Sequence, residues 1–172
     1  IGHLDVTSFG EVRQKGDVRY GRISLLPGSR YDINGAKLLP GGTGLRALDF
    51  QAGSKFTASG SGTSRVEGLA GSLNHFGSDL EVFGGAALEL QGLNSKSLPQ
   101  PNREFVYRIH KMGSLLLDDY EFRLCKVVGE GKASLTNAIV GGTGSVMVLE
   151  VAEVDLTGMN LQRDFLGEGL LE

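Results

Sequence analysis

The feature that most restricts the fold of this chain is a succession of short apolar runs separated by glycine. The clearest run is REFVYRIHK, in which Phe105, Tyr107 and Ile109 fall on one side and Val106 and Arg108 on the other. Side chains at alternate positions point to the same face of a β-strand, so this pattern predicts a strand. Similar runs recur along the chain with Gly, Asn, Asp, Ser or Pro between them, which is typical of an all-β protein.

Glycine accounts for 27 of the 172 residues and proline for only 4. This glycine content is about twice the average usage of ~7%. The apolar fraction of 40% is too high for a disordered chain, so the glycines indicate turns, bulges and strand kinks. GGTG occurs twice, at 41–44 and 141–144, and we interpret both copies as tight bends before a strand.

These patterns predict one all-β domain over residues 1–172, folded as an antiparallel up-and-down β-barrel of about eight strands with little helix. Residues 92–104 contain two prolines and no periodicity, so we expect a long loop there. Residues 157–172 are expected to form a C-terminal tail. The run SVMVLEVAEV is apolar on both faces and needs cover, which favours a homo-oligomer.

The net charge of −3 and the absence of a run of basic residues argue against a nucleic-acid partner. No apolar stretch is long enough for a membrane-spanning helix. A single cysteine, Cys125, excludes an internal disulfide and suits a reducing compartment. We therefore expect a cytoplasmic protein, with secretion left open because the chain does not begin with Met.

No motif points to a metal or a cofactor, so neither is expected. His3, His75 and His110 are far apart and lack the spacing of a zinc site. The segment VVGEGKAS does not meet the spacing of a phosphate-binding loop, and no G-x-S-x-G motif is present.

The segment from about Phe105 to Leu156 resembles the allene oxide cyclase-like β-barrel superfamily, which includes dirigent proteins and bacterial spirotetronate and spirotetramate cyclases. The residues that carry the resemblance are GEGKASLTNAIVGGTGSVMVLEVAEV, with an apolar run, GGTG and a further strand. After GGTG this chain departs from the dirigent pattern, and its N-terminal half matches none of these proteins.

The resemblance implies a cofactor-independent cyclase or isomerase that shapes a hydrophobic natural-product intermediate, such as a polyene polyketide, inside the barrel. A water-poor cavity could hold a flexible substrate in one reactive shape. The alternative is a non-catalytic binding protein, either dirigent-like or a carrier of hydrophobic ligands. A third interpretation is a structural or oligomeric β protein whose interior is filled by side chains.

Candidate catalytic residues are polar side chains on otherwise apolar strands. A buried Glu150 could exchange a proton, and the hydroxyls of Tyr20, Tyr107 and Tyr120 could donate to a substrate carbonyl. Each of these has a plainer interpretation, as a rim carboxylate or as a tyrosine packed in the core.

Four further residues are candidates for contact with the hydrophobic substrate. Arg108 and Arg123 could anchor an acidic headgroup, although solvated charges on a strand face are the plainer interpretation. Phe105 and Met147 are the apolar candidates for substrate binding.

Overall fold

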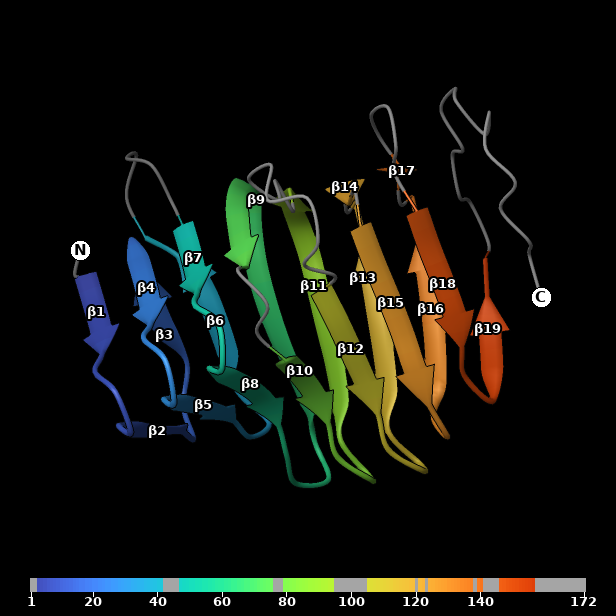
Figure 1. The fold of residues 1–172 in the computed structure, drawn as a ribbon, viewed down its shortest axis with the longest axis horizontal. Helices are drawn as coiled ribbons and strands as arrows, with labels where there is room; N and C mark the ends of the chain where they lie inside the picture. The colour runs from blue at the N-terminus through green and yellow to red at the C-terminus, as the bar shows by residue number, and fades with distance from the viewer. Residues whose placement is uncertain are drawn as a thin grey trace.

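The chain folds as a parallel β-solenoid, seen in a computed structural model that describes residues 3–41, 47–75, 79–94, 105–119, 121–122, 124–137, 139–140 and 146–156. Every strand pairing among these residues is parallel, and no described residue is helical. The strands wind around one axis and form three faces, so that each strand stacks on an equivalent strand of the previous turn (Figure 1).

We number the three faces in the order in which the chain first reaches them. The second face is a seven-stranded sheet, built from β2 (Glu11–Gln14), β5 (Arg30–Ile33), β8 (Lys55–Ala58), β10 (Asp79–Val82), β12 (Phe105–Ile109), β15 (Leu124–Gly129) and β18 (Val146–Glu150). Neighbouring strands in this sheet follow chain order, with one strand from each successive turn. Two other faces are joined into one larger sheet because the long strands β9 (Thr63–His75) and β11 (Ala87–Asn94) run across both.

The first face contains β1 (His3–Val6), β4 (Arg22–Leu25), β7 (Ala47–Phe50), the ends of β9 and β11, β14 (Glu121–Phe122) and β17 (Ile139–Val140). The third face contains β3 (Val18–Tyr20), β6 (Lys37–Pro40), the starts of β9 and β11, β13 (Ser114–Asp118), β16 (Lys132–Thr136) and β19 (Glu153–Asp155).

The predicted antiparallel barrel is therefore wrong, although the all-β class is confirmed. Side-chain alternation has the same period in parallel and antiparallel strands, so it does not report strand direction. The resemblance to the allene oxide cyclase-like superfamily is overturned with the barrel, because the segment that carried it forms β12 to β19 of the solenoid. Both GGTG stretches lie almost wholly outside the described residues.

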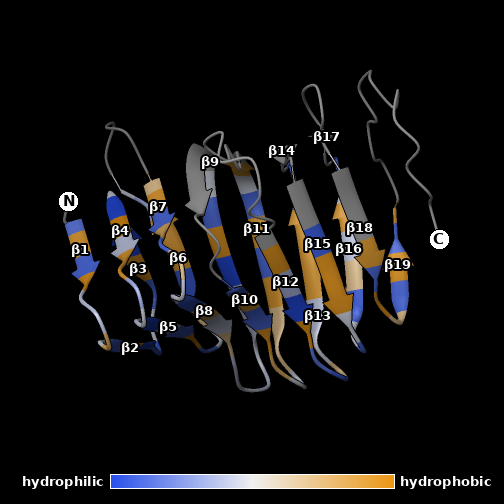
Figure 2. Cartoon of the chain, in the orientation of Figure 1, coloured by the Kyte–Doolittle hydropathy of each residue, from blue (hydrophilic) through white to orange (hydrophobic). Residues whose placement is uncertain are grey.

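The core is a set of ladders in which equivalent inward-facing side chains stack from turn to turn. On the second face one ladder consists of Val12, Tyr31, Phe56, Leu80, Tyr107, Val127 and Leu149. Its five central members are almost completely buried. The rings of Tyr31 and Phe56 stack at 5.5 Å with only 6° between their planes. Figure 2 shows the alternation of polar and apolar residues along these strands.

The corner between β15 and β16 shows why this fold needs glycine. The N–H groups of Glu130 and Gly131 both donate to the carbonyl of Ile109 in the turn below, at 2.9 and 3.1 Å. Gly129 has φ of 128°, and a Cβ at this position would collide with the same carbonyl oxygen. Two successive corners can therefore stack closely only because this position has no side chain.

A weak sequence repeat underlies the first turns. The segments GSRYDI, GSKFTA and GSDLEV begin at Gly28, Gly53 and Gly77, steps of 25 and 24 positions. The first two form β5 and β8, and the third leads into β10, so each segment opens a strand of the second face. Turn length varies, however: the step from Glu11 to its stacked partner Arg30 is 19 positions. Such variation hides the period of the solenoid.

The predicted long loop at 92–104 overlaps a strand, because Gly92 to Asn94 belong to β11. The rest of this loop lies outside the described residues, and so does the predicted tail at 157–172.

The stacked ladder makes a prediction about stability. Phe56→Ala should lower the free energy of unfolding by about 3–5 kcal/mol, because it removes a buried ring that stacks on Tyr31 and Phe50. Chemical denaturation followed by circular dichroism measures this loss. Phe9→Ala is the matched control, since Phe9 is 89% exposed, and should change stability far less. Equal losses in the two variants would contradict the ladder.

Candidate functional site

The described core contains a small gap among its apolar side chains. This gap has a volume of about 10 Å³. It is bordered by Leu48, Phe50, Phe56, Val66, Leu80, Leu90 and Leu93. A site for a small organic molecule needs roughly 300–1,000 Å³. This core gap is therefore far too small for a small-molecule ligand.

The candidate catalytic residues lie in different parts of the solenoid. Tyr20 is buried on β3, where its hydroxyl donates to the carbonyl of Glu67 at 3.0 Å. Tyr107 is buried in the ladder of the second face. Glu150 is exposed at the far end, where it accepts a hydrogen bond from Lys126 at 3.0 Å. Tyr120 lies outside the described residues. No common site unites the described three.

The candidate substrate-binding residues are also separate. Arg108 is exposed on β12, on the outside of the second face. Phe105 begins β12 and Met147 lies in β18, so they share the second face but are two strands apart in that sheet. Arg123 lies outside the described residues.

A different group of polar side chains surrounds a surface pocket of about 270 Å³ at the N-terminal end of the second face. We call it the polar pocket; its lining residues are Glu11, Arg13, Gln14, Lys15, Arg30, Asp32 and Asn34. They come from β2, β5 and the turns that follow these strands. The alternation that directs Val12 and Tyr31 into the core directs the charged residues of the same strands outward.

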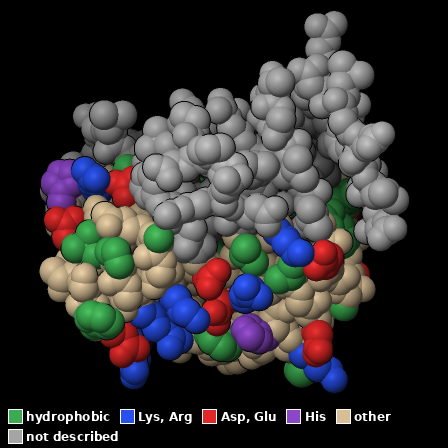
Figure 3. All heavy atoms as spheres, viewed as in Figure 1, with side chains coloured by type: hydrophobic (Ala, Val, Ile, Leu, Met, Phe, Trp, Pro, Cys, Tyr) green, Lys and Arg blue, Asp and Glu red, His purple; other side chains and the backbone are tan. Residues whose placement is uncertain are grey.

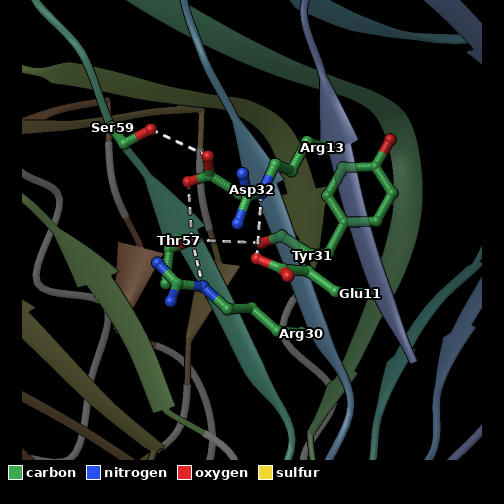
Figure 4. Close-up of polar contacts among 7 residues, drawn as sticks. All are labelled: Glu11, Arg13, Arg30, Tyr31, Asp32, Thr57 and Ser59. Atoms are coloured by element: carbon green, nitrogen blue, oxygen red, sulfur yellow. Dashed lines mark hydrogen bonds and ion pairs between the residues drawn. The ribbon is translucent and has the colours of Figure 1, made fainter. Parts of the chain in front are cut away.

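Asp32 is held in place by the neighbouring turn of the solenoid (Figure 4). Its carboxylate accepts hydrogen bonds from the hydroxyl of Thr57 at 2.7 Å and from that of Ser59 at 2.8 Å. Thr57 stacks directly on Asp32 in the parallel register between β5 and β8. The orientation of this carboxylate is therefore set before any ligand arrives.

The guanidinium of Arg30 has N–H donors that no described residue uses. Its Nε lies 3.4 Å from the hydroxyl of Thr57, and its guanidinium carbon lies 5.9 Å from the centre of the Phe83 ring. Within the described part of the chain, the two terminal nitrogens of this guanidinium have no hydrogen-bond partner. Since a guanidinium offers five N–H donors, Arg30 can bind an additional acceptor in the polar pocket.

The base of the polar pocket is rigid because Gln14 is buried and fully engaged. Its Nε2 donates to the carbonyls of Gly16 and Lys37 at 2.7 and 2.9 Å, and its Oε1 accepts from the Tyr31 hydroxyl at 2.7 Å. Burial raises the pKa of Tyr31 to about 12, so this hydroxyl remains a donor at neutral pH.

Beyond the polar pocket, the second face continues as a field of mixed charge, and both signs are visible on the surface in Figure 3. Glu81 lies 2.9 Å from Lys55 and 3.7 Å from His110. The His110 ring in turn stacks on Phe83 at 4.8 Å. Burial opposes ionisation of Glu81, but Lys55 and His110 together outweigh it, so the pKa of Glu81 is lowered.

Two further properties bear on function. Over the described ranges, no group of three or more His, Cys, Asp or Glu side chains is arranged to hold a metal ion. Nor does that part of the chain contain a helix long and apolar enough to cross a membrane.

No protein-family model, curated protein or solved structure gives a significant match to the chain.

Sequence reasoning missed the polar pocket because its parts are 19 positions apart and meet only through the stacking of β2 on β5. The pairs Glu11 with Arg13 and Arg30 with Asp32 do share a spacing of two residues. That spacing places both members of a pair on one face of a strand, but only the stacking of β2 on β5 brings the two pairs together.

The lowered pKa of Glu81 predicts a loss of stability in acid. A carboxylate with a depressed folded-state pKa stabilises the fold above its ordinary pKa of about 4.5, and this contribution is lost as the pH falls through the folded-state value. Denaturation measured from pH 7 to pH 3 should show this loss for the natural chain and a smaller one for Glu81→Gln. Glu130→Gln, at an exposed turn position, controls for removal of a carboxylate. A Glu81→Gln profile parallel to the natural one would contradict the assignment.

Proposed function

We propose that this protein is a rigid, non-catalytic binding module that holds a hydroxyl-rich ligand, an oligosaccharide, in the polar pocket on its second face. The proposal shares with the third interpretation of the sequence, a structural or oligomeric β protein, only an interior filled by side chains. The cyclase and the carrier of hydrophobic ligands both depend on an enclosed cavity, and the described core has a gap of only about 10 Å³.

The observation that carries the proposal is the chemistry of the pocket lining. All of its side chains are polar: three cations, two carboxylates and two amides. Each hydroxyl of a sugar both donates and accepts a hydrogen bond, so a lining with donors and acceptors close together suits a polyol. The lining mixes both signs of charge, three cations with two carboxylates, and an apolar ligand would leave these groups unpaired.

The rigidity of the site supports the same function. Asp32 is oriented by Thr57 and Ser59, and Gln14 by backbone carbonyls, so little conformational freedom is lost when a ligand binds. Arg30 supplies the unpaired donors. We therefore assign to Arg30 and Asp32 the central contacts, with one as donor and the other as acceptor.

Isothermal titration calorimetry with neutral linear hexasaccharides (cellohexaose, xylohexaose and maltohexaose) tests the proposal. We expect at least one of them to bind. Arg30→Gln should weaken that binding by about 10-fold or more, because it removes charged donors from the pocket. Lys126→Gln is the matched control, since Lys126 lies on the same face outside the pocket and pairs with Glu150.

The outcomes separate cleanly. Absence of binding by all three sugars at millimolar concentration would contradict the proposal, as would equal affinity in Arg30→Gln and the natural chain. Binding of hexagalacturonate in preference to the neutral sugars would identify a site for acidic ligands instead.

A further inference from the structure

The corner that follows β5 contains the only Asn–Gly pair of the chain, Asn34–Gly35. Asparagine is most prone to lose its side-chain ammonia before glycine, because glycine has no side chain to hinder attack by its own backbone nitrogen. Both residues are exposed, and Gly35 has φ of 58°. Water and base therefore reach this pair, and its local chemistry makes it a reactive site.

A buried hydroxyl from the next turn holds the peptide groups on both sides of Asn34. The N–H of Gly35 donates to the Oγ of Ser64 at 2.9 Å, and the same hydroxyl donates to the carbonyl of Ile33 at 3.4 Å. Ser64 is completely buried, as is Leu88, which stacks on it in the following turn. A polar group at such an inward position needs hydrogen-bond partners, and the corner after β5 supplies them.

The side chain of Asn34 is held as well. Its amide lies against Gly60, at the corner of the next turn, so closely that a Cβ on Gly60 would collide with it. Deamidation requires the Cγ of Asn34 to approach the nitrogen of Gly35 and that nitrogen to lose its proton. The fold opposes both steps, because the amide is seated on the next corner and the Gly35 N–H donates to Ser64.

We propose that Asn34–Gly35 is a deamidation site that Ser64 holds closed in the folded chain. When the corner opens, base removes the proton of the Gly35 nitrogen, which attacks the Cγ of Asn34. A C–N bond to this carbon forms, its bond to the amide nitrogen breaks, and ammonia leaves. Water then opens the cyclic imide at either carbonyl and gives aspartate or isoaspartate at position 34. No group is oxidised or reduced.

The modification changes the polar pocket, because Asn34 supplies one of its two amides. Deamidation replaces this uncharged group with a carboxylate in a lining that already holds Glu11 and Asp32. Isoaspartate also lengthens the backbone at a corner that packs closely on its neighbour. Ser64 therefore preserves the lining whatever ligand the pocket holds, and the inference does not depend on the proposed function.

Peptide mapping by mass spectrometry, on the full chain kept at mildly alkaline pH, tests the proposal. We expect Asn34 to deamidate at least about 10-fold more slowly in the folded chain than in guanidinium chloride, because reaction requires the corner to open. Ser64→Ala leaves the Gly35 N–H without its acceptor and should speed the reaction in the folded chain by about 10-fold or more.

Leu135→Ala separates release of the corner from a general loss of stability. Leu135 is completely buried on β16, and its truncation removes core packing without touching Ser64. This variant should deamidate at Asn34 near the natural rate while circular dichroism shows it folded.

Hydrogen exchange on the natural chain needs no variant, and the N–H of Gly35 should be protected although its corner is exposed. Rapid exchange of this N–H would overturn the proposal, as would equal rates of deamidation in the folded and unfolded chain. An unchanged rate in Ser64→Ala, or the same acceleration in Leu135→Ala, would overturn it too.

Discussion

In-register stacking of inward side chains is the interaction on which the rest of this structure depends. Each turn places an apolar residue directly over its equivalent in the turn before, as Tyr31, Phe56, Leu80 and Tyr107 show on the second face. Parallel strands lie about 4.8 Å apart, so these side chains are in continuous contact and leave almost no void. The gap among the core side chains accordingly measures only about 10 Å³.

The same register arranges the outside. A charged residue on one strand lies beside an outward residue of the next turn, which is how Asp32 meets Thr57 and how Glu81 meets Lys55. Polar groups that are 25 and 26 positions apart in the chain thus become neighbours on one face of the sheet. The polar pocket follows from this arrangement, because the stacking of β2 on β5 brings its lining residues together.

The β-strands and the faces of their side chains were predictable from the sequence. The relative direction of neighbouring strands was not. The alternation in 105–109 placed Tyr107 and Ile109 on one face and Arg108 on the other, and the structure buries the first two and exposes the third. The segments beginning at Gly28, Gly53 and Gly77 repeat at solenoid spacing and would have indicated stacked turns. Later turns differ in length, and their corners are formed by different residues, so the repeat fades. A barrel and a solenoid then remain equally compatible with the same strand pattern.

The sequence by itself determined that the chain forms short β-strands, which residues share a face of a strand, and that glycine falls between the strands, because these properties depend on neighbours a few positions away. Only the tertiary structure decided that the strands run parallel, that Tyr31, Phe56 and Tyr107 stack in one buried ladder, and that Arg30 and Asp32 share a pocket with Glu11 and Arg13. Those outcomes depend on which strand stacks on which, and the energy of stacking arises between residues far apart in the chain.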